Sequence, residues 1–127
     1  MATRTFILMY GRDPLLQKTR QLLLQSAGYQ VEIAERFSDI RKISALHRVD
    51  LLILCHSITQ EDALIAAELI ERRWPDSKCL ALSAERDAPD IDPCGEWLQA
   101  LEGPRKFINK VQKLVGVSGE TAALTVS

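Results

Sequence analysis

The sequence has no excess of charge of either sign. Sixteen Lys and Arg residues stand against seventeen Asp and Glu residues in a chain of 127, which gives a formal net charge of −1 at pH 7. A protein that holds a nucleic-acid backbone by counterion release needs a broad positive field, and this composition does not provide one. We therefore do not expect nucleic acid to be a direct ligand.

Long hydrophobic runs are also absent. No apolar stretch approaches the roughly 20 residues that cross a bilayer, and the opening Met-Ala-Thr-Arg-Thr lacks the apolar segment of a secretion signal. These two absences predict a protein without membrane contact. We expect it to be cytoplasmic.

Cysteine is scarce and shows no ligand spacing. Cys55, Cys79 and Cys94 are an odd number, and no two of them form a CxxC pair. This pattern argues against a disulfide framework and against a zinc site. Cys55 and Cys79 also fall at opposite ends of two neighbouring predicted strands, too far apart for a shared bond or metal ion. We expect buried, reduced thiols and no cofactor.

What the sequence does contain is a series of short apolar runs. Such runs are typical of strands buried on both faces of a sheet, and the predicted strands are residues 6–10, 29–33, 50–55, 78–83 and 96–100. Helical spacing and capping signals lie between and after them, at residues 13–28, 38–48, 57–74 and 103–115. Length and composition fit one domain, which we place at 1–116, followed by a flexible tail at 117–127.

The first predicted helix has clear boundaries. Asp13 followed by Pro14 is typical of an N-cap and a first helical residue, and Gly28 supplies the C-terminal stop. Its predicted apolar side repeats at helical spacing and consists of Leu15, Thr19, Leu22, Leu23 and Ala27.

The alternation of strands and helices predicts a parallel sheet with helices on both faces, because βαβ crossovers are right-handed and cover the sheet. In such folds, sites lie beyond the carboxyl ends of the strands. One segment breaks the alternation. Residues 84–95 hold two prolines and four acidic residues without a helical apolar repeat, so we predict a loop there.

Three segments carry a resemblance to a known family. Ile7-Leu8-Met9-Tyr10-Gly11-Arg12-Asp13-Pro14-Leu15-Leu16, Gly28-Tyr29-Gln30-Val31 and Val49-Asp50-Leu51-Leu52-Ile53-Leu54, in this order and spacing, resemble the receiver domain of two-component response regulators over about residues 5 to 115. The resemblance implies a flavodoxin-like α/β/α sandwich with a five-stranded parallel sheet of order 2-1-3-4-5. The helix before the fifth strand would be shortened or missing here.

Active receivers place two acids after the first strand, a phosphorylated aspartate after the third, Ser or Thr at the end of the fourth and lysine at the end of the fifth. Only Ser83 fits that pattern. The resemblance places the following residues in this degenerate pocket: Gly11, Arg12, Asp13, Cys55, Ser83 and Ala100. Asp13 remains as the helix cap, and Arg105 or Lys106 could reach the position of the missing lysine.

Mg²⁺ requires oxygen ligands in nearly octahedral geometry, and it neutralises the phosphoryl group during transfer. Gly11 and Arg12 cannot supply such ligands. We therefore predict a pseudo-receiver that is not phosphorylated, is not an enzyme and does not bind Mg²⁺. Arg12 either points into solvent or takes the cation's position and bonds Ser83, Asp13 or a backbone carbonyl.

Cys55 leaves a second hypothesis open. A thiolate beside an arginine could have a lowered pKa and act as a redox or small-molecule sensor, although a packed structural thiol is the favoured interpretation. A catalytic pair with His56 is disfavoured, since successive strand side chains point to opposite faces. Nucleotide binding is weaker still, because no glycine-rich phosphate loop is present.

With the pocket disabled, function must reside in protein contacts. The resemblance implies a partner face around the fifth strand and the last helix, where an acidic loop and a basic helix could form a self-complementary dimer. The candidate residues are Asp87, Asp90, Asp92, Trp97, Arg105, Lys106, Lys110 and Lys113, with Trp97 expected to pack mainly in the core. We predict an interaction module of bacterial-type signal transduction whose partner is another protein or a second copy.

Overall fold

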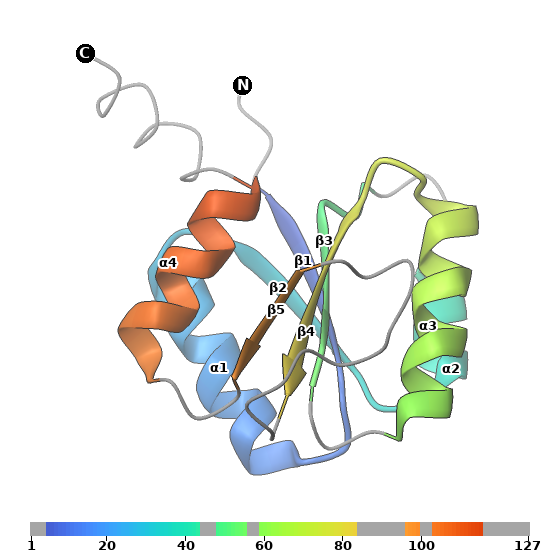
Figure 1. Ribbon diagram of the computed structural model, residues 1–127, viewed down its shortest axis with the longest axis horizontal. Coiled ribbons are helices and arrows are strands. Elements are labelled where there is room, and N and C mark those ends of the chain that lie inside the picture. The colour runs from blue at the N-terminus through green and yellow to red at the C-terminus, as the bar shows by residue number, and fades with distance from the viewer. Residues whose placement is uncertain (1–4, 44–47, 56–58, 84–95, 100–102, 116–127) are drawn as a thin grey trace.

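The computed structural model describes residues 5–43, 48–55, 59–83, 96–99 and 103–115. Strands and helices alternate along these residues (Figure 1). The strands are β1 (Phe6–Tyr10), β2 (Gln30–Ala34), β3 (Leu51–Leu54), β4 (Lys78–Ser83) and β5 (Glu96–Gln99). The helices are α1 (Pro14–Ser26), α2 (Phe37–Lys42), α3 (Gln60–Arg73) and α4 (Pro104–Val115).

The five strands form one parallel sheet of order β2-β1-β3-β4-β5, as predicted. Met9 in the central strand β1 pairs with Ile33 of β2 on one side and with Ile53 of β3 on the other. Figure 1 shows α1 and α4 on one face of the sheet and α2 and α3 on the opposite face. The flavodoxin-like sandwich is therefore confirmed. The shortened helix and loop predicted before β5, and the tail predicted at 117–127, lie outside the described residues.

Each face of the sheet has its own hydrophobic core. Leu8 and Tyr10 of β1 belong to the core under α2 and α3, whereas Ile7 and Met9 belong to the core under α1 and α4. This division follows from the alternation of side chains along a strand. It also explains why the strands are continuous apolar runs, since both faces of the sheet are covered.

The boundaries of α1 and α3 form as their capping signals predict. The carboxylate of Asp13 accepts from the Leu16 N–H at 3.2 Å, and Gly28 follows α1 with φ of 97°. At the start of α3, the Thr59 hydroxyl accepts from the Asp62 N–H at 3.1 Å. Both helices therefore start at the carboxyl edge of the sheet.

The predicted apolar side of α1 is wrong at two of its residues. Leu23 and Ala27 pack against the core under α1 and α4 as predicted, but Leu15 is 75% exposed and Leu22 is 55% exposed. Gln17, Arg20 and Leu24 are buried instead. The spacing of three and four residues between these buried positions is that of one helix face. The buried face of α1 therefore combines Leu24 with the polar side chains of Gln17 and Arg20. The spacing of apolar residues alone does not predict such a face.

Helix α2 starts one residue before the predicted Ser38. Its first turn is fixed by Asp39, whose carboxylate accepts from the N–H groups of Glu35 at 3.0 Å and Arg36 at 3.1 Å. These bonds are also why the pKa of the Asp39 carboxyl lies below its ordinary value. Ile40 of α2 is buried, and the helix ends at Lys42, short of the predicted residue 48.

The expectation that the cysteines are reduced is wrong for Cys79, which is disulfide-bonded. Cys55 is a free thiol, so the bond is not the Cys55–Cys79 pair that strand geometry excludes, and the partner of Cys79 lies outside the described residues. Across the described ranges, no helix combines the length and the apolar character needed to span a membrane.

Candidate functional site

The carboxyl edge of the sheet brings most of the predicted pocket residues together. Tyr10 of β1 pairs with Leu54 of β3, and the Cys55 N–H donates to the Tyr10 carbonyl at 2.9 Å. Gly11 and Cys55 therefore follow two neighbouring strands side by side. Ser83 ends the next strand, β4, at the same edge.

The other residues predicted at the pocket are Ala100 and Asp13, together with Arg105 and Lys106 as candidates for the missing lysine. Ala100 lies outside the described residues, so the position of the missing lysine is not tested. Arg105 and Lys106 are exposed in the first turn of α4. Asp13 caps α1, so its carboxylate is already engaged by the Leu16 N–H.

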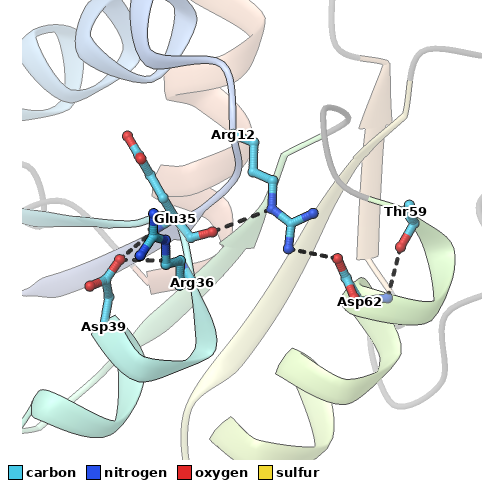
Figure 2. A network of polar contacts seen from close by, with 6 residues as sticks. All are labelled: Arg12, Glu35, Arg36, Asp39, Thr59 and Asp62. Atoms are coloured by element: carbon cyan, nitrogen blue, oxygen red, sulfur yellow. Dashed lines mark hydrogen bonds and ion pairs between the residues drawn. The ribbon is translucent and has the colours of Figure 1, made fainter.

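Arg12 turns toward the α2 and α3 face of the sheet (Figure 2). Its guanidinium lies 2.8 Å from a carboxylate oxygen of Asp62 in α3, and its Nε donates to the Glu35 carbonyl at 3.4 Å. A backbone carbonyl was among the predicted partners, whereas Asp62 was not. The side chain of Arg12 is 48% exposed, so the ion pair adds little to stability but fixes where the charge lies.

Arg12 therefore joins three elements across the rim of the site. Figure 2 shows the guanidinium between the Glu35 turn, which precedes α2, and the capped first turn of α3. Asp39 orders the first of these segments and Thr59 the second. Arg12, at a position where the resemblance led us to expect an acid, is a cation with its own protein partners.

Beneath Arg12, the side chain of Tyr10 is fully buried. Its ring packs against Phe37 of α2 with the centroids 5.5 Å apart, and its hydroxyl has no hydrogen-bond partner of acceptable geometry among the described residues. Burial raises the pKa of the Tyr10 phenol, and the nearby Arg12 charge opposes that rise only in part. Tyr10 is thus a neutral core residue.

Cys55 is buried in the opposite core, under α1 and α4, with 2% of its surface exposed. Burial raises the pKa of its thiol to about 11, although the charge of Arg20 opposes the rise. A sensor thiol requires a lowered pKa and access to solvent. The structure therefore supports the structural-thiol interpretation and contradicts the chemical premise of the sensor hypothesis.

The sequence-based reasoning missed Gln17 and Arg20. Arg20 is 9% exposed, and its charge lowers the pKa of the Cys55 thiol, although burial raises that pKa by more. Gln17 is fully buried, and neither its amide oxygen nor its amide nitrogen has a hydrogen-bond partner among the described residues. Their spacing with Leu24 was the available signal, because residues three and four apart share one helix face.

Solved structures with a similar fold are receiver domains. One is the signal receiver domain of an HD domain-containing protein from Pseudomonas fluorescens, with a TM-score of 0.74 and 18% identity over 88% of this chain and 94% of that chain. Another is the response regulator TrrA from Thermotoga maritima, solved with Mg²⁺ and BeF, with a TM-score of 0.68 and 23% identity over 87% and 98%. An orphan response regulator of H. pylori matches with a TM-score of 0.73 and 11% identity over 91% and 99%. The chain has the receiver fold.

Neither a protein-family model nor a curated protein matches the chain. Gly11, Arg12 and Cys55 lie at the carboxyl edge of the sheet, where the resemblance to receivers led us to expect the degenerate pocket.

These residues do not fit a divalent ion. Gly11 has no side chain, Arg12 brings a positive charge, and the thiol of Cys55 is protonated at neutral pH. The nearby carboxylates of Asp13 and Asp62 are engaged by a helix cap and by Arg12. Mg²⁺ takes carboxylate and water oxygens, and among the described residues no group of three or more His, Cys, Asp or Glu side chains could hold a metal ion.

The candidate interaction face is placed only in part. Arg105, Lys106 and Lys113 are exposed on α4, and Lys110 is partly buried, while Phe107 and Val111 on the opposite side of the helix are buried in the core. Asp87, Asp90 and Asp92 lie outside the described residues, as does the side chain of Trp97. The charge complementarity predicted for a dimer therefore stays a prediction.

Proposed function

We propose that this receiver-fold protein is not phosphorylated and acts as a protein-interaction module in bacterial-type signal transduction. The proposal rests on the residues that lie at the carboxyl edge of the sheet. Arg12 is bonded to Asp62 and Glu35 where active receivers hold an acid, and a buried, protonated Cys55 stands at the acceptor position. Solved structures of similar fold include both response regulators and an orphan regulator, which supports a role in signalling.

The proposed loss of phosphoryl transfer has two independent causes. No metal ion can neutralise the transferred group while a guanidinium occupies the edge. The acceptor is also unreactive, because a thiol with a pKa of about 11 is almost entirely protonated at neutral pH. For the same reason we propose no catalytic activity for the Cys55 thiol.

Intact-mass spectrometry after incubation with Mg²⁺ and acetyl phosphate tests the proposal. We expect an unchanged mass, while an active receiver treated in parallel gains one phosphoryl group. A stoichiometric phosphoryl adduct on this chain would overturn the proposal. Peptide mapping would then identify the acceptor.

We further propose that the partner contacts the basic side of α4, either as another protein or as a second copy. Support comes from the exposed cations of α4, a helix that contains no acidic residue. In the second-copy case the acidic segment at 84–95 supplies the opposite charge. Light scattering of the double variant Arg105→Glu, Lys113→Glu tests that case, with Arg72→Glu on the other face of the sheet as the matched control.

A dimer that persists in the control and dissociates in the α4 variant would support self-association. A monomer at all concentrations, together with a captured partner whose binding is lost in the α4 variant, would support a separate protein. Binding that is indifferent to the α4 variant would exclude this face.

We place this role in the cytoplasm, where receivers meet their partners. The disulfide bond of Cys79 argues against this placement, because protein disulfides are rare in the cytoplasm. Rapid alkylation of cells under denaturing conditions decides between the two. Labelling of Cys79 without prior reduction would show that the bond does not form in the cell and would support the cytoplasm, whereas labelling that requires a reductant would contradict it.

A further inference from the structure

A pocket with a volume of about 250 Å³ lies at the amino edge of the sheet, opposite the carboxyl edge. The neighbouring strands β1, β3 and β4 begin there, and α4 ends beside the start of β1 (Figure 1). We call this site the amino-edge pocket. It is lined by the last two residues of α4 and by polar residues at or before the strand starts, which are Thr5, Arg48, Asp50, Asp76 and Lys78.

Asp50 fixes the frame of the pocket. Its N–H donates to the Phe6 carbonyl at 2.9 Å, and its carbonyl accepts from the Lys78 N–H at 3.0 Å. One oxygen of its carboxylate accepts from the Phe6 N–H at 2.9 Å, and the other lies 2.6 Å from the Arg48 Nε. Only 16% of the Asp50 side chain is exposed. Asp50 is therefore a positioning residue, which joins three strands and orients the Arg48 guanidinium.

The end of α4 supplies an apolar wall. Leu114 and Val115 pack against the core under α1 and α4, the core to which Leu80 of β4 also belongs. Side chains two residues apart on a strand share a face of the sheet, so Lys78 lies on the same side as Leu80. A charged side chain and two aliphatic side chains therefore border the same space.

The amino-edge pocket also presents charges of both signs that remain available to a ligand. Arg48 contacts Asp50 through Nε, and its side chain is 80% exposed, which leaves the two terminal nitrogens accessible. Lys78 and Asp76 are exposed, and neither forms an ion pair with another described residue. The C-terminal end of α4 adds a partial negative charge. Two cationic donors thus face the pocket together with a carboxylate and a helix end that favour a cation.

We propose that the amino-edge pocket binds a small zwitterion of the amino-acid type, with a carboxylate, an ammonium group and a short branched apolar side chain. The carboxylate binds Arg48 and Lys78, because an oriented guanidinium fork matches a carboxylate. The ammonium group binds Asp76 at the C-terminal end of α4. The apolar side chain packs against the wall that Leu114 and Val115 form.

The volume and the balance of charge exclude other ligand classes. Pockets for drug-sized ligands measure about 300–1,000 Å³, so a volume of about 250 Å³ fits a smaller molecule. An anion without an ammonium group leaves Asp76 unmatched, and an amine without a carboxylate leaves Arg48 and Lys78 unmatched. The inference goes beyond the proposed function and does not depend on it, because the pocket lies at the opposite edge of the sheet.

NMR titration of the full chain with L-valine tests the inference. We expect saturable shifts at the backbone amides of Thr5, Lys78, Leu114 and Val115. Isovalerate keeps the carbon skeleton of valine without the ammonium group, and isobutylamine keeps it without the carboxylate. We expect each of these two probes to bind at least about tenfold more weakly than L-valine, since each loses charge-assisted hydrogen bonds.

Two variants connect the binding to the proposed contacts. Lys78→Met and Asp76→Asn each remove one charge from an exposed side chain, so the fold is retained, and each should weaken L-valine binding at least about tenfold. The matched control is Lys18→Met, on α1 near the other edge of the sheet, which should leave the affinity unchanged.

Three results would overturn the inference. The first is an absence of saturable shifts at the pocket amides with L-valine. The second is equal binding of isovalerate, which would make the pocket a simple anion site. The third is an L-valine affinity that Lys78→Met and Asp76→Asn change no more than the Lys18→Met control does.

Discussion

Cys55 shows how the surroundings of one residue decide its chemistry. The thiol stands at the edge where receivers carry out phosphoryl transfer, yet only 2% of its surface is exposed. Desolvation disfavours the thiolate more than the nearby Arg20 favours it, so the net pKa shift is upward. Position alone would suggest reactivity, and burial reverses that conclusion.

Alkylation of Cys55 in the folded protein should therefore be slow. At neutral pH we expect a rate at least about a hundredfold below that of an exposed thiol, because both access and thiolate fraction are reduced. The rate should climb as the pH rises toward about 11, above the ordinary thiol value of 9.0. Peptide mapping after timed treatment with iodoacetamide measures it.

A rate equal to that of the unfolded chain, with an inflection below the ordinary thiol value, would contradict this account. Cys55→Ser keeps the shape of the side chain and serves as the blank. Such a result would also revive the sensor hypothesis.

Gln17 tests how much a buried polar side chain without hydrogen-bond partners costs in stability. Its amide is fully buried and neither polar atom has a partner among the described residues. An unsatisfied buried amide costs about 1–3 kcal/mol. Gln17→Leu should therefore raise the free energy of unfolding by about 1 kcal/mol in urea denaturation.

Gln25→Leu, on the exposed side of α1, is the matched control and should change stability by less than about 0.5 kcal/mol. A loss of stability in Gln17→Leu would show that the amide has a partner in solution, such as an ordered water.

At the scale of the element, α2 is a short helix that depends on its neighbours. Arg73 of α3 donates to the carbonyls of Ile40 at 3.1 Å, Arg41 at 3.2 Å and Ile43 at 2.6 Å, at the C-terminal end of α2. Its guanidinium also lies 4.7 Å from the centre of the Trp74 ring. These bonds satisfy the carbonyls that a helix end leaves open.

Arg73→Met should destabilise the protein by about 2 kcal/mol, since three charge-assisted bonds are lost and only the aliphatic packing is kept. Arg72→Met, one residue earlier and exposed, should cost less than about 0.5 kcal/mol. Thermal unfolding of both variants measures the difference. Equal effects of the two substitutions would show that α2 does not depend on Arg73.

The elements themselves could be predicted because their signals are local. β1 and β4 begin and end at the predicted residues, since continuous apolar runs mark strands covered on both faces. The face of α1 could not be predicted from apolar spacing, because two polar residues share its buried stripe with Leu24. The sequence alone does not distinguish a buried arginine such as Arg20 from an exposed one.

The same distinction holds for the site. Gly11, Cys55 and Ser83 could be placed because the ends of parallel strands meet at one edge. The pairing of Arg12 with Asp62 depends on how far a long side chain reaches between elements, which the sequence pattern does not show.

At the scale of the whole molecule, the chain has the receiver fold. The strand order is the one predicted, and similar solved structures cover most of this chain. At the carboxyl edge of the sheet, Arg12 pairs with Asp62 and with the Glu35 carbonyl, and Cys55 is buried. We propose that these contacts hold the receiver fold in one state.

The most direct test of this claim is an NMR titration of the unmodified protein with Mg²⁺ and beryllofluoride, followed at the backbone amides of Gly11, Cys55 and Ser83. We predict that these signals do not move, because the described residues at this edge include no cluster of carboxylates that could hold the metal, and position 55 carries a buried thiol in place of a carboxylate. Saturable shifts confined to these amides would contradict the account.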